Sequence, residues 1–525
     1  MVPLLPTWVL INHCALSFPM AFLTAYVLFF ATLFTSIVAY RLSSFHPLAK
    51  YPGPIMCKIS QLWTVLVYSR GKGHHYRKML HDQYGPIVRI GPNELSVTEK
   101  DMLPYILGSQ GMPKGPLFEG RRMTSVSQKD TEHFNLIATR DLQRHAVLRK
   151  AWSRAFADAP LRDYEELMLA RARQLIHTLK TICEKQGGVG GVDVASWIDY
   201  FTFDFMGDMA FGGGFELMRD GDSERLLSNM AMSLYYACLC QAVPWFSPVL
   251  RKLPYVGEPI RAFGSFAFKL AKIRYDQEPD KKDLFYHMIA AYRADSQESP
   301  FTLILSNSLL AIVAGADTTA TVLKNTIFYL LTNPAYYARL REEVDAAFPP
   351  TETSALDTRI LPSLPFLNAV INEVLRLQPP VSTTLQRAPA RGTKGKLVGT
   401  HYIKEGTHIQ VPPYVLHRDP RYFYPRPDEF WPDRWILGTS DSAEFVLDRS
   451  AFIPFSMGPA NCAGKSLAML ELRAVVSMFI MHFDMEFGDN FDPRVWMESL
   501  KDFFVLECGK LMVKLRVRKR KGFEL

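Results

Sequence analysis

The first forty residues of the chain contain no Asp, Glu, Lys or Arg. Residues 19–40 (PMAFLTAYVLFFATLFTSIVAY) form an apolar run of 22 residues, enough as a helix to cross the roughly 30 Å hydrocarbon core of a bilayer. This run constrains the chain more than any other feature, because a membrane span separates what precedes it from the globular part that follows. We therefore expect a membrane anchor over residues 1–45 and a globular body over residues 46–525.

A cleaved signal peptide is the alternative interpretation of this run. The run is too long for one, has no basic segment before it and lacks a clear small-x-small cleavage site. The basic residues that follow it are Arg41, Lys50, Lys58, Arg70 and Lys72. By the positive-inside rule they place the body in the cytoplasm. Residues 2–18 fit either a second, shorter span or a segment at the lumenal interface.

Composition narrows the class of protein further. With 48% hydrophobic and 12% aromatic residues and no low-complexity linker or repeat, the body fits one large domain with an ample core. Seven cysteines without paired spacing argue against a disulfide framework and favour a reducing compartment. The net charge of +8 is modest and scattered, which argues against nucleic acid and leaves an acidic protein or the anionic membrane surface as a partner.

Two kinds of pattern alternate in the body. Residues 84–98 (YGPIVRIGPNELSVT) place β-formers between two Gly-Pro breaks and predict a hairpin, and residues 397–413 return to strand and turn character. Most of residues 141–250 and 306–376 has the 3.6-residue period of helices. The expected fold class is mainly α (α+β), a helical body with small β-sheets at one side.

One cysteine lies in a loop of small residues ahead of an apolar helix, in PFSMGPANCAGKSLAMLELR (residues 454–473). A sulfur near a helix N-terminus meets unpaired backbone N–H groups and the positive end of the helix dipole, and both favour thiolate over thiol. We therefore expect Cys462 to be an anion. On these grounds alone it is a nucleophile, a redox centre or a metal ligand.

A second motif, AGADTT (residues 314–319), lies in a predicted helix over residues 306–332. Its simplest interpretation is a polar stripe, or a hydroxyl bonded to the carbonyl four residues earlier. Gly315, however, costs about 1 kcal/mol in a helix interior and suggests the close approach of a flat ligand. If Thr318 diverts a carbonyl, the helix loosens and leaves a groove beside Asp317, with room for a small molecule and a proton path.

A third motif, NEVLRLQPP, sets Glu373 and Arg376 three residues apart on one helical face before two prolines end the helix. A solvated surface pair is the ordinary interpretation of this spacing. Residues 417–435 (HRDPRYFYPRPDEFWPDRW) supply Arg434. We expect it to complete a buried Glu-Arg-Arg cluster that clamps the long coil leading to Cys462.

In this order, AGADTT, ExxR, PDEFWPDRW and FSMGPANCAG resemble the motifs of the cytochrome P-450 haem-thiolate monooxygenases. The resemblance covers about residues 52–516, and PGP after the apolar run resembles the microsomal branch. Residues 144–165 resemble fungal members, in which a similar stretch crosses the haem edge. The resemblance implies the cytochrome P-450 fold, a haem b cofactor, and a single-pass anchor that holds a cytoplasmic catalytic domain at the endoplasmic reticulum membrane.

The resemblance also assigns roles residue by residue. Cys462 becomes the axial ligand of the haem iron, and Thr318 with Asp317 becomes the oxygen-binding and proton-delivery pair. The resemblance implies that Phe455, Gly458 and Gly464 shape the loop around the sulfur. The implied contacts to the haem propionates are His145, Arg149 and Arg387. The implied structural cluster is Glu373, Arg376 and Arg434.

The sequence departs from the family pattern in three places. Ala460 replaces a basic residue two before the cysteine, His145 replaces a tryptophan one turn before the helix arginine, and Lys404 replaces the proline of an IPxGT turn. We expect haem binding to survive these changes, because the ligand and the loop glycines remain. What the departures affect is the set of propionate contacts.

The implied activity is an NADPH-dependent monooxygenase, in which O2 is cleaved at iron and one oxygen atom enters a C–H bond of a lipophilic substrate. The implied electron donor is a membrane-bound NADPH-cytochrome P-450 reductase, with cytochrome b5 as a further donor. An acidic flavin domain fits a basic face made of Arg144, Lys150, Arg154, Lys465 and Arg473.

Three other functions compete with this interpretation. A haem-thiolate isomerase that needs no reductase shares the fold, but it has no need of the proton-delivering threonine. A membrane-bound cysteine hydrolase requires a positioned histidine, and none of the 13 histidines lies in a recognisable motif. A non-catalytic scaffold has no use for the acid and alcohol of AGADTT.

The resemblance also indicates which segments line the substrate pocket. They are residues 112–128, 231–246, 305–316, 381–385 and 499–504, and they are rich in Leu, Ala, Phe and Met. A bulky apolar substrate is therefore expected, first a terpenoid of fungal secondary metabolism and alternatively an aromatic xenobiotic.

Overall fold

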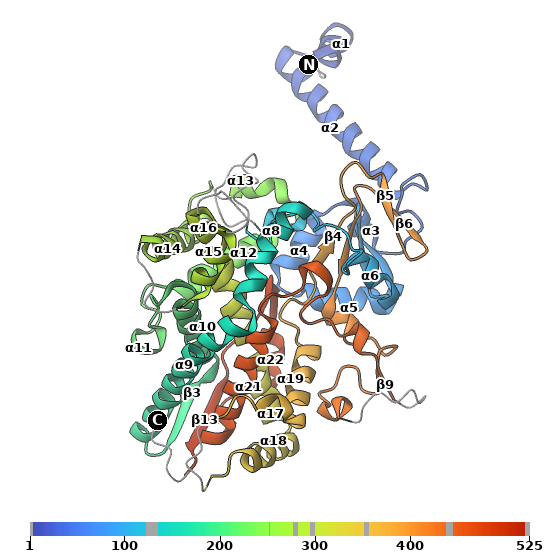
Figure 1. Ribbon diagram of the computed structural model, residues 1–525. Coiled ribbons are helices and arrows are strands. Elements are labelled where there is room, and N and C mark those ends of the chain that lie inside the picture. Colours follow the sequence, from blue (N-terminus) through green and yellow to red (C-terminus); the bar gives the residue numbers. More distant parts are fainter. Residues whose placement is uncertain are drawn as a thin grey trace.

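The computed structural model describes residues 4–121, 135–250, 252–276, 282–293, 300–350, 356–436 and 445–519. The chain begins with two helices, α1 (Leu4–Cys14) and α2 (Phe18–Leu42), which project from the body (Figure 1). α2 contains the whole predicted span, and only 11% of its most apolar window is buried. By length and composition it can cross a membrane. α1 packs beside the tip of α2 and is about 16 Å long, which favours an interfacial segment over a second span.

Helices make up most of the body. After α2 they are α3 (Ile55–Ile59), α4 (Leu62–Ser69), α5 (Gly73–Tyr84), α6 (Leu103–Ile106), α7 (Leu117–Gly120), α8 (Leu142–Ala155), α9 (Asp158–Lys185), α10 (Val194–Phe211), α11 (Leu217–Asp220), α12 (Leu226–Ala242), α13 (Ser247–Leu250), α14 (Gly257–Asp276), α15 (Leu284–Arg293), α16 (Pro300–Ile312), α17 (Thr318–Thr332), α18 (Pro334–Ala347), α19 (Pro365–Leu377), α20 (Pro413–Leu416), α21 (Lys465–His482) and α22 (Pro493–Ser499).

The strands are short and form small sheets. They are β1 (Ile87–Gly91), β2 (Glu94–Val97), β3 (Val189–Asp193), β4 (Leu385–Arg387), β5 (Gly395–Val398), β6 (His401–Lys404), β7 (His408–Val411), β8 (Phe423–Tyr424), β9 (Val446–Leu447), β10 (Phe483–Phe487), β11 (Lys501–Phe503), β12 (Val505–Glu507) and β13 (Met512–Val517). One sheet has the order β1-β2-β7-β4, with β2 and β7 parallel, and a second has the order β10-β13-β3. The remaining strands form the antiparallel pairs β5-β6, β8-β9 and β11-β12. The predicted class, a mainly helical body with small sheets, is confirmed.

Several local predictions are confirmed as well. The hairpin predicted over residues 84–98 is the antiparallel pair β1-β2, and residues 397–413 contain β5, β6 and β7. The strand β3 inside the predicted helical region was not expected. Its sequence, VGGVD, carries no strand signal of its own, and the strand forms because β13 pairs with it from far along the chain.

The predicted long helix is interrupted in the structure. It consists of α16, a π-helical segment at Val313–Asp317, and α17, which ends before Asn333-Pro334 as predicted. The stretch Leu303–Thr332 is apolar enough to span a membrane, but 61% of its most apolar window is buried inside the body. α17 is accordingly a core helix, which packs against α10, α19 and α21. The cavity described next borders this core.

Candidate active site

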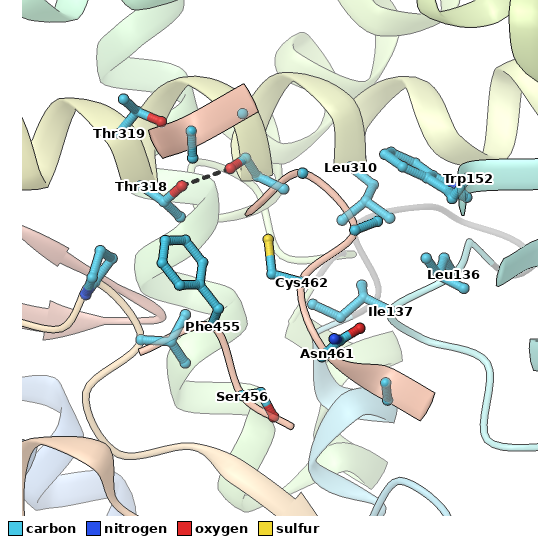
Figure 2. Close-up of a pocket in the computed structure, with 18 of the residues that line it drawn as sticks. Leu136, Ile137, Trp152, Leu310, Thr318, Thr319, Phe455, Ser456, Asn461 and Cys462 are labelled. Carbon is cyan, nitrogen blue, oxygen red and sulfur yellow. Dashed lines mark hydrogen bonds between the residues drawn. The ribbon is translucent and has the colours of Figure 1, made fainter. Parts of the chain in front are cut away.

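A cavity of about 280 Å³ lies between the loop that carries Cys462 and the helix that carries Thr318. Figure 2 shows the Cys462 sulfur pointing toward that helix, with Phe455 beside it. Apolar side chains from separate parts of the chain complete the wall, among them Trp152 and Leu310. The structure therefore brings two of the predicted motifs, the cysteine loop and AGADTT, to one enclosed space.

Backbone hydrogen bonds fix the cysteine loop. The Cys462 N–H donates to the Phe455 carbonyl at 2.9 Å, and the Asn461 N–H donates to the Gly458 carbonyl at 3.1 Å. Gly458 has a φ of +70°, and an added Cβ would lie 2.2 Å from the Leu107 carbonyl oxygen, so only glycine fits there. Gly464 directly precedes α21, whose first turn therefore lies just after the cysteine.

The expectation that this loop alone makes Cys462 an anion is wrong. Burial raises the pKa of the thiol, and this outweighs the backbone N–H of Gly464 and the positive charges of Arg149 and Lys465, which lower it. Cys462 is exposed to the cavity that it lines. A metal ion that coordinates a thiol deprotonates it, so a bound metal would favour the thiolate at this position.

The hydroxyl bond that the sequence predicts is present at the π-helical turn. The Thr318 hydroxyl donates to the Ala314 carbonyl oxygen at 2.8 Å, as Figure 2 shows by its dashed line. Both residues line the cavity. Gly315 lines the cavity, and the predicted approach of a flat ligand there stays a prediction. The structure shows a second reason for the glycine, because an added Cβ would lie 2.2 Å from the Met206 sulfur. Gly315 permits α10 to pack closely on this turn.

The last residue of this turn, Asp317, is a partly buried acid. Burial raises the pKa of Asp317 to about 7, and the negative charges of Asp199 and Glu507 add to the rise, while the Lys324 ammonium opposes it. Lys324, which is buried in α17, lies 2.5 Å from Asp199 of α10. Sequence reasoning missed this pair, because a single lysine in an apolar helix does not reveal its partner more than a hundred residues earlier.

A cluster of positive side chains borders the same cavity. Burial lowers the pKa of His145 to about 3, and Lys114, Arg149 and Arg387 lower it further by charge repulsion. Burial lowers the pKa of Arg387 to about 10 and that of Lys114 well below its usual value. Within the part of the chain that the structure describes, no carboxylate forms an ion pair with any of the four. The cluster therefore suits a ligand with negative charge.

Lys114 is the member of this cluster that sequence reasoning did not identify. It lies in MPKGP, is 8% exposed, and donates to the Leu136 carbonyl. Its backbone pairs with that of Arg387 in an isolated bridge. A lysine among apolar and turn residues was the only available signal. Arg149 donates to the side-chain oxygen of Asn461 at 2.6 Å, which holds α8 against the cysteine loop.

The residues of the predicted Glu-Arg-Arg cluster come together and are fully buried. Glu373 accepts from Arg376 at 2.8 and 2.9 Å and from Arg434 at 3.1 Å. Two further donors reach its carboxylate, the Trp431 N–H and the Trp435 indole, and these charges and donors hold the pKa of Glu373 below its usual value. Both arginines also donate to backbone carbonyls of residues 417–429. The coil before the cysteine loop is thus tied to α19.

The predicted basic face is smaller than expected. Lys150, Arg154 and Lys465 are exposed. Arg144 is half-buried and donates to the Tyr292 hydroxyl, and Arg473 is half-buried and donates to Asn368. These two arginines hold elements of the body together, so the exposed part of the face consists of the three other residues.

Four of the five predicted pocket segments reach the cavity. They contribute Lys114, Phe118, Arg121, Leu310, Ala311, Ala314, Gly315, Val381, Thr384, Leu385 and Phe504. Residues 122–128 of the first segment lie outside the described residues. Among the described lining residues none comes from 231–246; Met206 and Met209 of α10 contribute instead.

Comparison with known proteins agrees with this geometry. The sequence model of the family described as Cytochrome P450 matches residues 50–514. The chain is 31% identical to Cytochrome P450 67 of Uromyces fabae over 481 residues, which cover 90% of this chain and 86% of that protein.

Two further relatives come from other fungi. Over 485 residues the chain is 31% identical to the cytochrome P450 monooxygenase FCK2 of Fusarium pseudograminearum, covering 91% of this chain and 83% of that one. Over 493 residues it is 30% identical to the tryprostatin B 6-hydroxylase of Aspergillus fumigatus, covering 93% and 83%. The chain therefore belongs to the cytochrome P450 family, whose members are monooxygenases with haem b as their cofactor.

Proposed function

We propose that this chain is a membrane-anchored monooxygenase that hydroxylates a lipophilic small molecule, with electrons from NADPH. The observation that carries the proposal is the position of the Cys462 sulfur, which opens into an apolar cavity opposite Thr318. A cysteine that acted as a hydrolytic nucleophile would need a basic partner. His145, the histidine that lines this cavity, has its pKa lowered to about 3 and lies among cations.

The residues of the cavity fit haem b. Lys114, Arg149 and Arg387 place basic side chains around the neutral His145, without carboxylate partners among the described residues, and haem b carries two propionates. Cys462 supplies a sulfur ligand in the same cavity. We therefore assign Cys462 as the axial ligand and the positive cluster as the propionate site. Because Ala460 offers no charge, Lys114 takes the place of the basic residue that usually lies there.

Haem with a thiolate ligand supplies reductive activation of O2 and cleavage of its O–O bond. The chain positions the reactants and moves protons. Thr318 presents a hydroxyl to the cavity from the opened turn, and Asp317 holds a proton near neutral pH, which suits a proton donor. Lys324 and Asp199 form an ion pair and both act on Asp317. The Lys324 ammonium lowers the pKa of Asp317, and the Asp199 carboxylate raises it. Apolar side chains make up most of the wall of the space where the substrate would bind.

The finer parts of the proposal concern location and pathway. α2 and the basic residues after it support an anchor in the endoplasmic reticulum membrane, with residues 46–525 in the cytoplasm. In this location NADPH-cytochrome P-450 reductase is the proposed electron donor, and cytochrome b5 is a second one. Relatives that are fungal hydroxylases support a role in secondary metabolism. The apolar lining supports a terpenoid or a similarly apolar substrate over a polar one.

Replacement of Cys462 tests the proposal. The Cys462→Ala variant should lose the carbon-monoxide difference spectrum that defines haem-thiolate proteins and all NADPH-dependent oxidation. Cys57→Ala is the control, because Cys57 is a buried thiol in α3, outside the cavity lining. If Cys462→Ala kept the spectrum and the activity, the assignment would be overturned. If the parent instead isomerised a peroxide without NADPH, the isomerase alternative would replace the monooxygenase.

A further inference from the structure

We infer that the substrate carries a carboxylate group, and that Arg121 binds it in the wall of the cavity. This inference rests on the proposed function and adds the chemical class of the substrate. Arg121 directly follows α7, is 9% exposed and lines the cavity.

The guanidinium of Arg121 is held in a fixed orientation. Its Nε atom donates to the Gln241 side-chain oxygen at 3.0 Å, and its Nη2 atom donates to the Thr384 hydroxyl. The Gln241 amide is in turn anchored by a contact with the Cys238 sulfur at 3.3 Å. The ring of Phe504 stacks on the guanidinium, with a centroid 4.1 Å away. The Nη1 side therefore keeps N–H groups that no acceptor among the described residues uses.

In the described part of the chain Arg121 forms no ion pair, and its two side-chain acceptors are neutral. Burial lowers the pKa of Arg121 to about 10, and Cys238, Tyr68 and the Asp502 carboxylate only partly oppose this lowering. A buried cation that is not directly paired with an anion is unfavourable, so an anionic ligand in the cavity would stabilise it.

Most contacts of Arg121 lie on the side of the predicted substrate segments. They are with α12, with the segment before β4 and with the turn between β11 and β12. Arg121 has one neighbour in common with the cluster that we assign to the propionates, because Arg121 and Lys114 lie over the same Phe118 ring, 5.4 and 5.8 Å from its centroid. Their hydrogen-bond partners differ, since Lys114 donates to the Leu136 carbonyl and Arg121 donates to Gln241 and Thr384.

Carboxylate is the anion that this geometry suits. A planar guanidinium with one free edge accepts the two oxygens of a carboxylate in one plane. Around Arg121 the cavity is apolar, with Phe118, Phe504 and Val381 among its lining residues. The expected substrate is accordingly an apolar molecule, such as a cyclic terpenoid or a long-chain acid, with a single carboxylate at one end.

The test uses two pairs of probes, dehydroabietic acid with its methyl ester and dodecanoic acid with its methyl ester. Binding to the haem-loaded full chain is followed by the substrate-induced shift of the Soret band. In the parent, at least one acid should bind about tenfold or more tightly than its ester, because a hydrogen-bonded charge is lost in the ester. In Arg121→Gln the preference for that acid should vanish while the ester binds within about twofold of the parent.

Two controls make the outcome decisive. Arg219→Gln removes an exposed arginine of α11 that pairs with Asp220, and it should keep the parent's preference. Arg121→Lys should retain part of the preference for the acid over the ester, because lysine keeps the positive charge. A purely structural role of Arg121 would not predict this result. Equal binding of acid and ester to the parent, or an acid preference that survives in Arg121→Gln, overturns the inference. Absence of the carbon-monoxide difference spectrum in the parent would instead overturn the proposed function, so the two failures are distinguishable.

Discussion

The hydroxyl of Thr318 lies 2.8 Å from the carbonyl oxygen of Ala314, to which it donates, and the turn between them is π-helical. A hydroxyl that takes the i−4 carbonyl competes with the backbone N–H of the helix, and the turn widens. The widened turn borders the cavity, so its hydroxyl is placed to exchange this hydrogen bond for one to a bound molecule.

The first prediction concerns Thr318. Thr318→Ala should keep haem content and substrate binding but uncouple the reaction, so that NADPH is consumed mainly to form hydrogen peroxide. The reason is that the hydroxyl that orders proton delivery is gone while the cavity keeps its shape. Thr318→Ser should restore most of the coupling. The measurement is the ratio of product and peroxide to NADPH consumed.

A matched control for this prediction exists in the same helix. Thr332 at the end of α17 donates to the Phe328 carbonyl at 3.0 Å and does not line the cavity. Thr332→Ala should therefore leave the coupling at the parent's value. Coupling in Thr318→Ala equal to that of Thr332→Ala would remove Thr318 from the mechanism.

The second prediction concerns the pH dependence of stability. Burial raises the pKa of Asp317 to about 7, whereas a carboxyl in the unfolded chain titrates near pH 4. Between these values the folded state binds more protons than the unfolded state, so the contribution of Asp317 to stability falls as pH rises through this window. Asp317→Asn does not titrate. Relative to the parent, the variant should gain up to about 4 kcal/mol between pH 4 and pH 8, because the pKa values differ by about three units and each unit corresponds to about 1.4 kcal/mol.

Thermal unfolding of parent and variant at several pH values measures this gain. Groups that do not interact with Asp317 titrate alike in both proteins and cancel in the difference. Asp101→Asn is the control, because Asp101 is exposed and its replacement should give a difference that does not change with pH. The prediction fails if the difference between Asp317→Asn and the parent is also constant across the window.

The residues that the sequence could identify share one property, namely that local chemistry reveals them. Cys462 lies among small residues, Glu373 and Arg376 share a helical face, and Thr318 distorts its own helix. The helices and the β1-β2 hairpin follow from local periodicity in the same way.

What the sequence could not predict depends on contacts between distant segments. Lys324 meets Asp199 only because α17 packs on α10, and Arg121 meets Thr384 and Phe504 only in the folded body. The pKa of Cys462 is a similar case, since the helix N-terminus is visible in the sequence but the burial that outweighs it is not. The position of Gly315 inside a helix is visible in the sequence, but its contact with Met206 of another helix is not.

The third prediction concerns Lys114 as a haem contact. Lys114→Met removes one of the buried charges that we assign to the propionates, and haem should be lost about tenfold or more faster. Lys114→Arg should hold the haem nearly as well as the parent. The measurement is the transfer of haem to excess apomyoglobin, followed by absorbance. Lys78→Met is the control, because Lys78 pairs with Asp82 on the surface of α5. Equal rates for Lys114→Met and Lys78→Met would exclude Lys114 from the propionate site.

The fourth prediction concerns docking of the reductase. The bond from Arg149 to Asn461 holds α8 against the loop next to Cys462, and Lys150 and Arg154 of α8 are exposed. We expect these two residues to face an acidic flavin domain. Attraction between exposed charges falls with salt, since the Debye length is about 10 Å at 0.1 M. The Lys150→Glu, Arg154→Glu double variant should therefore be reduced several-fold more slowly at low salt, with the gap closing as salt rises.

Stopped-flow formation of the reduced carbon-monoxide complex measures this first electron transfer. The charge-matched control is Lys269→Glu with Lys272→Glu, where both lysines are exposed on α14, a helix that packs mainly against α12 and α16. That control should be reduced at the parent's rate. Turnover driven by added hydrogen peroxide bypasses the reductase, so it should be unchanged in both double variants if only docking is affected. Equal reduction rates for the α8 variant and the α14 control throughout the salt titration would place the docking surface elsewhere on the body.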